Sequence, residues 1–250
     1  MVKVEDPRQG VRLITLDDPE RRNAMGARMG AELEAAVGDL AANRDVRVVV
    51  ITGAGTAFCA GADLPALFGA TGGPLTETHA RLQAYYRTFF SVFELPIPTI
   101  AAVNGPAVGA GLNLAMACDV RVAGPQASLA PTFTRIGLHP GGGCTWFLVR
   151  ALGRSRALRT LLLGEVIPAE QAVAWGLAEG PEDDCVTAAL DLGERFADLD
   201  PLLAKHVKRA VGIAADTGDL GATLEYESWA QAASASSAEL QAWVARFRND

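Results

Sequence analysis

The amino-acid sequence predicts an α/β protein with a helical C-terminal region. Up to about residue 154, short apolar runs with the composition of strands alternate with segments of helical periodicity, which is typical of a mostly parallel, layered sheet. Beyond that point the periodicity is helical almost to the end of the chain. The chain shows no internal repeat, low-complexity tract or obvious linker, so one α/β domain with a helical tail is the simplest organisation.

The first strand is expected at residues 11–16, where apolar and polar side chains alternate. After a turn at 17–20, apolar residues recur at helical spacing over 29–40, which predicts an amphipathic helix. The run 46–51 is rich in β-branched residues, as in a strand that is covered on both faces. Asp63 stands where the N-cap of a further helix is expected.

Residues 71–75 contain two glycines and a proline and predict a flexible break. An amphipathic helix is then expected at 77–94 and a strand at 99–103. A segment rich in glycine and alanine opens a short helix at 110–117, and residues 119–123 predict the next strand. Strand and helix therefore alternate through this part of the chain.

The rest of the chain is predicted to be helical. The run 140–143, one proline followed by three glycines, opens the first of these helices. Further helices are expected at 154–163, 168–175, 184–198, 200–215 and 219–247.

Composition excludes several classes of protein. The chain carries 22 basic and 29 acidic residues, and an acidic chain of this kind is a poor candidate for nucleic-acid binding. Its four cysteines show no metal-ligand spacing, and scattered unpaired cysteines fit a reducing cytoplasm. Residues 1–10 lack the apolar core of a signal peptide, and no run approaches the roughly 18 apolar residues of a membrane span. We therefore expect a cytoplasmic protein without a metal site or a membrane span.

Two segments, 58–63 and 104–111, bring small residues and glycines to a helix start after a strand. The first N–H groups of a helix have no partner within the helix and lie at the positive end of its dipole. Two such N–H groups that converge on one point would form an oxyanion hole, whereas the simpler interpretation is a pair of tight turns. A nucleotide-binding glycine loop is disfavoured, because Phe58 stands where the third glycine is needed.

Taken together, six stretches give the chain a clear resemblance to the crotonase (enoyl-CoA hydratase/isomerase) superfamily. They are spread over most of the sequence and keep the order and spacing of the family's motifs. The matching stretches are 19–24, 53–63, 100–105, 109–111, 118–119 and 136–142.

The resemblance implies a spiral of ββα units with a core over 1–195 and a helical trimerisation region over 196–250. Members of this family bind CoA thioesters and commonly assemble as trimers or dimers of trimers. They act in fatty acid metabolism as lyases or isomerases. The resemblance implies no cofactor beyond the CoA of the substrate itself.

The resemblance also assigns site residues. The backbone N–H groups of Ala62 and Ala110 match the two that hold the thioester oxygen and stabilise an enolate. The positions that match the family's CoA pocket are Arg21, Arg22, Ala24, Ala60, Gly61, Leu64 and Gly109. Trp243 and Arg246 match the part of the family's C-terminal helix that reaches the CoA of a neighbouring subunit. The simpler alternatives are solvated loop charges for the arginines, a packing role for Trp243 and a helix cap for Asp63.

The sequence departs from the family at both glutamates that hydratases use. Their positions are occupied by Asn113 and Phe133. Addition of water needs a base to activate the water and an acid to protonate the α-carbon. Asparagine can orient a water or hold a carbonyl but cannot take a proton, and phenylalanine can do neither. Ordinary hydration is therefore doubtful.

Three other side chains are candidates for the missing chemistry. His139 lies in the loop before Pro140 and could be a general base, although a loop histidine is more often structural. His79 lies on a segment that in this family borders the acyl pocket. Cys144 follows the glycine run and could be a nucleophile, or simply a small buried thiol at a helix start.

The sequence leaves three functions open. One is an enzyme with hydratase or isomerase chemistry that uses His139 or a carboxylate outside the motifs. The second is a non-catalytic acyl-CoA carrier or regulatory protein that kept the oxyanion hole and lost the acid and base. A nicotinamide-dependent reductase is the third and weakest, because the chain lacks the Tyr-x-x-x-Lys pair expected of such an enzyme.

Overall fold

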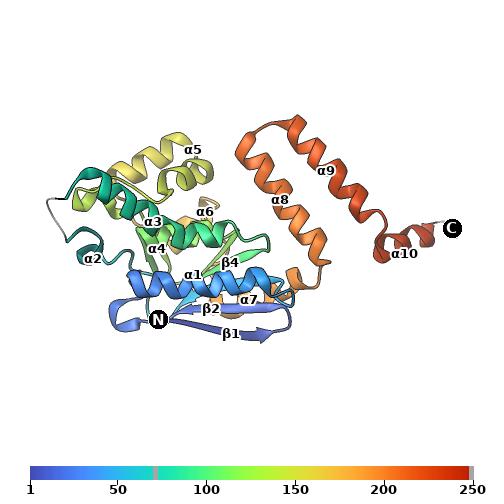
Figure 1. Cartoon of the computed structure of the whole chain (residues 1–250), viewed down its shortest axis with the longest axis horizontal. Coiled ribbons are helices and arrows are strands. Elements are labelled where there is room, and N and C mark those ends of the chain that lie inside the picture. The colour runs from blue at the N-terminus through green and yellow to red at the C-terminus, as the bar shows by residue number, and fades with distance from the viewer. Residues whose placement is uncertain (70–72, 248–250) are drawn as a thin grey trace. The chain divides into compact units, whose positions relative to one another are not determined.

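The computed structural model describes residues 1–69 and 73–247 (Figure 1). The chain forms two compact units, Met1–Ala197 and Asp198–Asp250. Positions 71 and 72 of the predicted flexible break lie outside the described residues.

The first unit is built on a five-stranded sheet with the strand order β1-β2-β3-β4-β6. The hairpin β1–β2 is antiparallel, and every other pair is parallel, as the alternation of strands and helices predicted. The strands are β1 (Val2–Arg8), β2 (Val11–Leu16), β3 (Val48–Gly53), β4 (Thr99–Val103) and β6 (Val120–Ala123). β1 was not predicted, because it is a largely exposed edge strand that carries charged residues and lacks a clear apolar face.

A second sheet has the order β5-β7-β8 and was not predicted. Its strands are β5 (Pro106–Val108), β7 (Ser128–Ala130) and β8 (Ile167–Pro168). Strands of three residues or fewer are too short to show a periodicity in the sequence. β5 is nevertheless important for the site, because it leads directly into α4.

Helices cover both faces of the five-stranded sheet (Figure 1). The larger ones are α1 (Ala27–Ala42), α3 (Leu75–Phe93), α4 (Ala110–Ala117), α5 (Cys144–Leu163) and α7 (Cys185–Ala197), with the short α2 (Leu64–Phe68) and α6 (Ala169–Ala174). α5 joins the predicted helix 154–163 to the helix that opens after 143, with a kink at Gly153, where φ is +73°.

The central strand β3 shows why the sheet is layered. All six of its residues are buried. Val49 and Ile51 pack into the core with α1, α3 and α4, whereas Val48 and Val50 face α7 on the other side. A strand that is apolar on both faces is the mark of a parallel sheet covered twice, which confirms the prediction from the β-branched run at 46–51.

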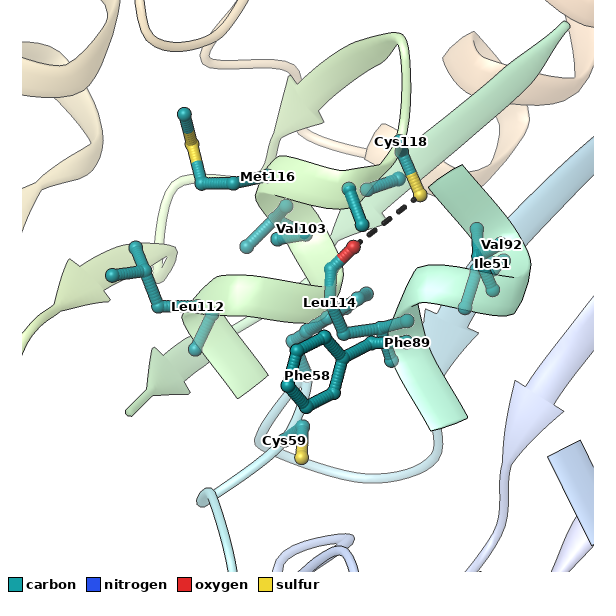
Figure 2. Packing of buried hydrophobic residues seen from close by; sticks show 14 of the residues in the cluster. Ile51, Phe58, Cys59, Phe89, Val92, Val103, Leu112, Leu114, Met116 and Cys118 are labelled. Atoms are coloured by element: carbon teal, nitrogen blue, oxygen red, sulfur yellow. Dashed lines mark hydrogen bonds between the residues drawn. The ribbon is translucent and has the colours of Figure 1, made fainter. Parts of the chain in front are cut away.

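Buried side chains fix α4 in this core. Figure 2 shows Phe58 and Phe89 packed against Leu114, with Ile51 and Val92 close by. Every residue of α4 is buried, which makes this short helix a rigid element. Its N-terminus, at Ala110, is therefore held firmly in place.

Asn23 ties the loop before α1 to the loop after β3. It is fully buried and adopts a left-handed backbone conformation with φ of +57°. Its Nδ2 donates to the carbonyl oxygens of Ala54 and Ala57, at 2.9 and 2.8 Å, and its Oδ1 accepts from the N–H of Asp18. This side chain thus braces the backbone that continues into the segment 58–63.

The second unit consists of α8 (Pro201–Thr217), α9 (Leu220–Ser234) and α10 (Ala238–Phe247). A helical C-terminal region was predicted correctly, but a single helix over 219–247 was wrong. The chain breaks after Ser234, and the Ser237 hydroxyl accepts a hydrogen bond from the N–H of Leu240 at 3.2 Å. Ser237 therefore caps a new helix in the middle of the predicted one.

Candidate functional site

A pocket of about 420 Å³ opens in the first unit. Its lining comes from the stretches 60–68, 82–89, 108–113 and 132–141. Most of these side chains are apolar, and its volume lies in the range of small-molecule sites, about 300–1,000 Å³. The pocket therefore suits a ligand with an apolar group.

Two backbone N–H groups at this pocket are left without partners. Ala62 and Ala110 both line it. Within residues 1–69 and 73–247, neither N–H donates a hydrogen bond to the protein. Ala110 is the first residue of α4, so its N–H also lies at the positive end of the helix dipole. Such donors favour an oxygen that carries negative charge.

The segments that carry these two N–H groups are in direct contact. The N–H of Val108 donates to the Cys59 carbonyl at 2.9 Å, and the N–H of Cys59 donates to the carbonyl of Pro106. A Cβ at Gly61 would lie 2.7 Å from the Val108 oxygen and 3.7 Å from the Ala110 nitrogen. The two glycine-bordered helix starts of the sequence therefore lie side by side.

Gly111 makes this close approach possible. A Cβ at this position would lie only 2.2 Å from the carbonyl oxygen of Cys59 and 2.7 Å from its Cβ. No side chain fits in that space, so α4 can pack against the backbone of the 58–62 segment only with glycine here.

Both positions that correspond to the missing glutamates lie at the pocket. Asn113 is 2% exposed, and its Nδ2 donates to the carbonyl of Gly141 at 2.9 Å. Its Oδ1 is buried and has no hydrogen-bond partner. Phe133 lies beside Gly109, where an added Cβ would be 3.7 Å from the phenyl ring. None of the described residues that line the pocket is an aspartate or a glutamate, so no substitute carboxylate was found there.

His139 lines the same pocket and is exposed to solvent. Its Nδ1 lies 2.7 Å from the carbonyl oxygen of Pro140. Because a carbonyl oxygen can only accept, Nδ1 carries the proton in the neutral ring. The lone pair of Nε2 is then available to take a proton from a ligand.

The other two candidates lie elsewhere. His79 is an exposed residue of α3 and does not line the pocket. Cys144 is buried at the start of α5, and burial raises the pKa of its thiol to about 12. A thiol with so high a pKa stays protonated near neutral pH and is a poor nucleophile. The structure thus supports the simpler interpretation, a small buried thiol.

All four cysteines should resist alkylation in the folded protein. Each is buried, and burial raises the pKa of Cys59 to about 11. The raised pKa values of Cys59 and Cys144 keep their reactive thiolates at about one part in a thousand or less at pH 8. Mass spectrometry after iodoacetamide treatment should show no adduct on the native protein and four after denaturation. Rapid native labelling of Cys144 would instead restore it as a candidate nucleophile.

The residues assigned to a CoA pocket fall into three groups. Ala60, Gly61, Leu64 and Gly109 line the cavity. Arg21, Arg22 and Ala24 do not line it but lie close by, because the N–H of Ala60 donates to the Arg22 carbonyl at 2.9 Å. Trp243 and Arg246 belong to α10 of the second unit, where the guanidinium lies 5.3 Å from the centre of the indole ring.

Asp63 is a helix cap, which was the simpler interpretation of its position in the sequence. Its carboxylate accepts from the N–H of Ala66 and caps α2. It also forms an ion pair with Arg21 at 2.7 Å, and the hydrogen bond from Arg21 lowers the pKa of the Asp63 carboxyl. Asp63 is therefore a helix cap that also orients Arg21.

One wall of the pocket is formed by α3, the helix of His79; the resemblance implied that this segment borders the pocket, but its lining residues were not predicted. Leu82, Tyr85, Tyr86 and Phe89 all lie on α3 and line the cavity. The Tyr85 hydroxyl donates to the carbonyl of Met25 at 3.3 Å, and burial raises the pKa of that phenol. The positions i, i+3, i+4 and i+7 form one face of a helix, so this aromatic stripe was visible in the sequence.

Comparisons with known proteins identify one family. The family model described as enoyl-CoA hydratase/isomerase matches residues 6–249. A Mycobacterium tuberculosis protein assigned as an enoyl-CoA hydratase, EchA14, is 54% identical over 182 residues, 73% of this chain and 70% of its own. The 1,2-epoxyphenylacetyl-CoA isomerase of Escherichia coli is 34% identical over 96% of this chain and 92% of its own.

One similar solved structure contains a bound ligand. It is a protein of Thermobifida fusca assigned as an enoyl-CoA hydratase and crystallised in complex with CoA. It superimposes with a TM-score of 0.82 at 32% identity and covers 93% of this chain and 91% of its own.

Proposed function

The chain belongs to the enoyl-CoA hydratase/isomerase (crotonase) family, and from that premise we propose that it binds an acyl-CoA thioester. The acyl group lies in the pocket, and the thioester oxygen accepts hydrogen bonds from the N–H groups of Ala62 and Ala110. The observation that carries the proposal is this pair of unpartnered N–H groups at one apolar pocket. Preorganised donors of this kind stabilise the negative charge of an enolate oxygen.

The CoA part of the ligand is assigned to the mouth of the pocket. Arg21 and Arg22 are exposed cations next to the segment that carries Ala60, and they would bind the phosphates of CoA. Trp243 and Arg246 of one subunit would contact the CoA that is bound by a neighbouring subunit. The CoA-bound relative of Thermobifida fusca supports the binding of CoA itself. The ligand brings its own CoA, and no further cofactor is proposed.

Hydration of enoyl-CoA is proposed to be feeble. Asn113 and Phe133 supply neither an acid nor a base, and no carboxylate of the described residues lines the pocket. The remaining machinery can bind a thioester and polarise its carbonyl. This combination supports the second candidate function, a non-catalytic acyl-CoA carrier or regulatory protein.

Isomerisation is the enzymatic alternative, and the geometry of His139 favours it. Moving a double bond needs one base that removes a proton from the acyl chain and returns it at another carbon. With Nδ1 bonded to Pro140, Nε2 of His139 has the free lone pair that this role requires. In that case the enolate would be held by Ala62 and Ala110 between the two proton transfers.

The assembly and the setting of the protein are part of the same proposal. Residues 196–250 would mediate a trimer or a dimer of trimers, since α8, α9 and α10 expose large apolar side chains such as Val211, Trp229 and Trp243.

A cytoplasmic protein of fatty acid metabolism fits the acidic charge and the four unpaired cysteines. Among the described residues, no helix is both long and apolar enough to cross a bilayer, and no side chains cluster as metal ligands.

A comparison of two ligands tests whether the thioester carbonyl is bound. Butyryl-CoA should bind at least about tenfold more tightly than S-butyl-CoA, because the thioether lacks the oxygen that two N–H groups would hold. Isothermal titration calorimetry measures both affinities, with free butyrate as the control for the acyl chain alone. Equal affinities for the thioester and the thioether would contradict the proposed oxyanion hole.

A further inference from the structure

We propose that Tyr86 makes the pocket selective for oxo-acyl thioesters, in which the acyl chain carries a ketone oxygen some carbons away from the thioester. The Tyr86 hydroxyl would donate a hydrogen bond to that oxygen. This inference rests on the proposed function, since it needs the acyl group in the pocket, and it narrows the class of ligand. It also distinguishes the preferred ligand from a plain hydrocarbon acyl chain.

The observation is a difference between two neighbouring tyrosines of the pocket wall. Tyr85 and Tyr86 are both half-buried and both line the pocket. The Tyr85 hydroxyl donates to the carbonyl of Met25 at 3.3 Å, so its hydrogen is already used. In the part of the chain that the structure describes, the Tyr86 hydroxyl has no such partner, and its oxygen is not buried. The Tyr86 hydroxyl is therefore both accessible and free to donate.

Gly141 fixes where this hydroxyl lies. Gly141 also lines the pocket, and a Cβ at this position would collide with the Tyr86 hydroxyl oxygen and lie 3.3 Å from Cζ of its ring. The hydroxyl thus occupies the space that a side chain at 141 would fill. The ring itself is packed 5.9 Å, centre to centre, from the fully buried ring of Phe89. Tyr86 is therefore a donor that is held in place before the ligand binds.

Filling the pocket changes what this hydroxyl can bind. Water can accept its hydrogen bond while the pocket is empty, but an acyl chain that fills an apolar pocket displaces that water. A plain hydrocarbon chain would then leave the donor unpaired, which is costly away from water. A phenol donates more strongly than it accepts, because its oxygen shares electron density with the ring, so the fitting partner is an acceptor such as a ketone oxygen.

The contacts of Gly141 indicate which part of the ligand meets Tyr86. The Gly141 carbonyl accepts from Nδ2 of Asn113 at 2.9 Å, and Asn113 lies three residues beyond Ala110 on α4, a rise of about 4.5 Å. If the thioester oxygen accepts from the N–H of Ala110, the Tyr86 hydroxyl would meet the chain beyond the carbons next to the thioester. The fourth and fifth carbons of an extended acyl chain lie about that far from the thioester carbonyl.

Thr132 offers another hydroxyl at the pocket and is the competing donor. Its aliphatic hydroxyl donates and accepts with similar ease, so it imposes no preference for a ketone. A phenol on a packed ring does impose one. Thr132→Val therefore belongs in the test beside the substitutions of the tyrosines.

The test compares ligands that differ by one ketone oxygen. Calorimetry measures the affinities of the full-length protein for hexanoyl-CoA, 4-oxohexanoyl-CoA and 5-oxohexanoyl-CoA. One of the two oxo compounds should bind at least about tenfold more tightly than hexanoyl-CoA, as expected when an acceptor pairs with a desolvated donor. Tyr86→Phe should reduce this ratio to about one. The matched control is Tyr85→Phe, which removes a hydroxyl that is already bonded and should preserve the ratio, as should Thr132→Val.

Two results would overturn the proposal, and the first needs no variant. Equal binding of hexanoyl-CoA and both oxo compounds to the unsubstituted protein would refute the selectivity and leave acyl-CoA binding intact. A preference that survives in Tyr86→Phe would refute the role of Tyr86, and its loss in Thr132→Val would then assign the donor to Thr132. Failure of all three thioesters to bind would instead overturn the proposed function, and this inference with it.

Discussion

Replacing Asn113 and Phe133 together by glutamate should raise the rate of crotonyl-CoA hydration by about 10²-fold or more, as expected when a missing acid and base are supplied. Both positions lie at the pocket that carries the unpaired N–H groups of Ala62 and Ala110. The double variant would combine a polarised thioester with a carboxylate that activates water and a carboxyl that protonates the α-carbon. Hydration is measured by the loss of enoyl absorbance and by the added mass of water.

The matched control is the double variant with glutamine at both positions. Glutamine has nearly the same shape and polarity as glutamate but cannot transfer the proton, so its hydration rate should stay at the level of the unsubstituted protein. Either glutamate alone should give only a small gain, because the acid and the base act in one reaction. If the glutamate and glutamine variants hydrate at the same rate, the two positions do not explain the missing activity.

Gly111→Ala should weaken the binding of butyryl-CoA by about 10²-fold or abolish it, because an overpacked backbone contact costs several kcal/mol or moves the chain apart. The new Cβ would lie 2.2 Å from the Cys59 carbonyl oxygen, which belongs to backbone and cannot rotate away. α4 would have to shift from the 58–62 segment, and the N–H groups of Ala62 and Ala110 would separate. Calorimetry gives the affinity, and circular dichroism shows whether the fold is retained.

Gly38→Ala is the control for this substitution. Gly38 lies in α1, and an added Cβ there has nothing within 4 Å. Alanine in an exposed helix position should stabilise the fold by up to about 1 kcal/mol and leave the affinity unchanged. Tight binding of butyryl-CoA by Gly111→Ala would show that the close contact between α4 and Cys59 is not needed for the site.

Local sequence signals predicted the elements that are long or strongly patterned. The β-branched run at 46–51 gave the central strand β3, and the apolar spacing over 29–40 gave α1. The edge strand β1 was missed, because a charged, exposed strand has no buried face to pattern it. The break between α9 and α10 was missed because a single serine cap interrupts an otherwise helical composition.

The residues of the site that belong to a family motif could be predicted from the sequence. The parts of the site that depend on long-range contacts could not. The spacing of the family's motifs placed Asn113 and Phe133 at the pocket. Whether two loops converge depends on bridges such as that between Val108 and Cys59, and no local pattern encodes these. The unpaired Oδ1 of Asn113 likewise could not be predicted, because it depends on how Asn113 packs against Gly141, a residue distant from it in the sequence.

Turnover of a panel of enoyl-CoA thioesters, short to long, tests the central claim most directly. Products are separated by chromatography and identified by mass spectrometry, so that hydration appears as added water and isomerisation as a shifted peak of unchanged mass. We expect the thioesters to bind while hydration stays far below ordinary enzymatic rates, which are about 1 to 10³ s⁻¹. Isomerisation that is lost in His139→Ala would fit this account and identify His139 as the base. Hydration by the unsubstituted protein at an ordinary rate would contradict it.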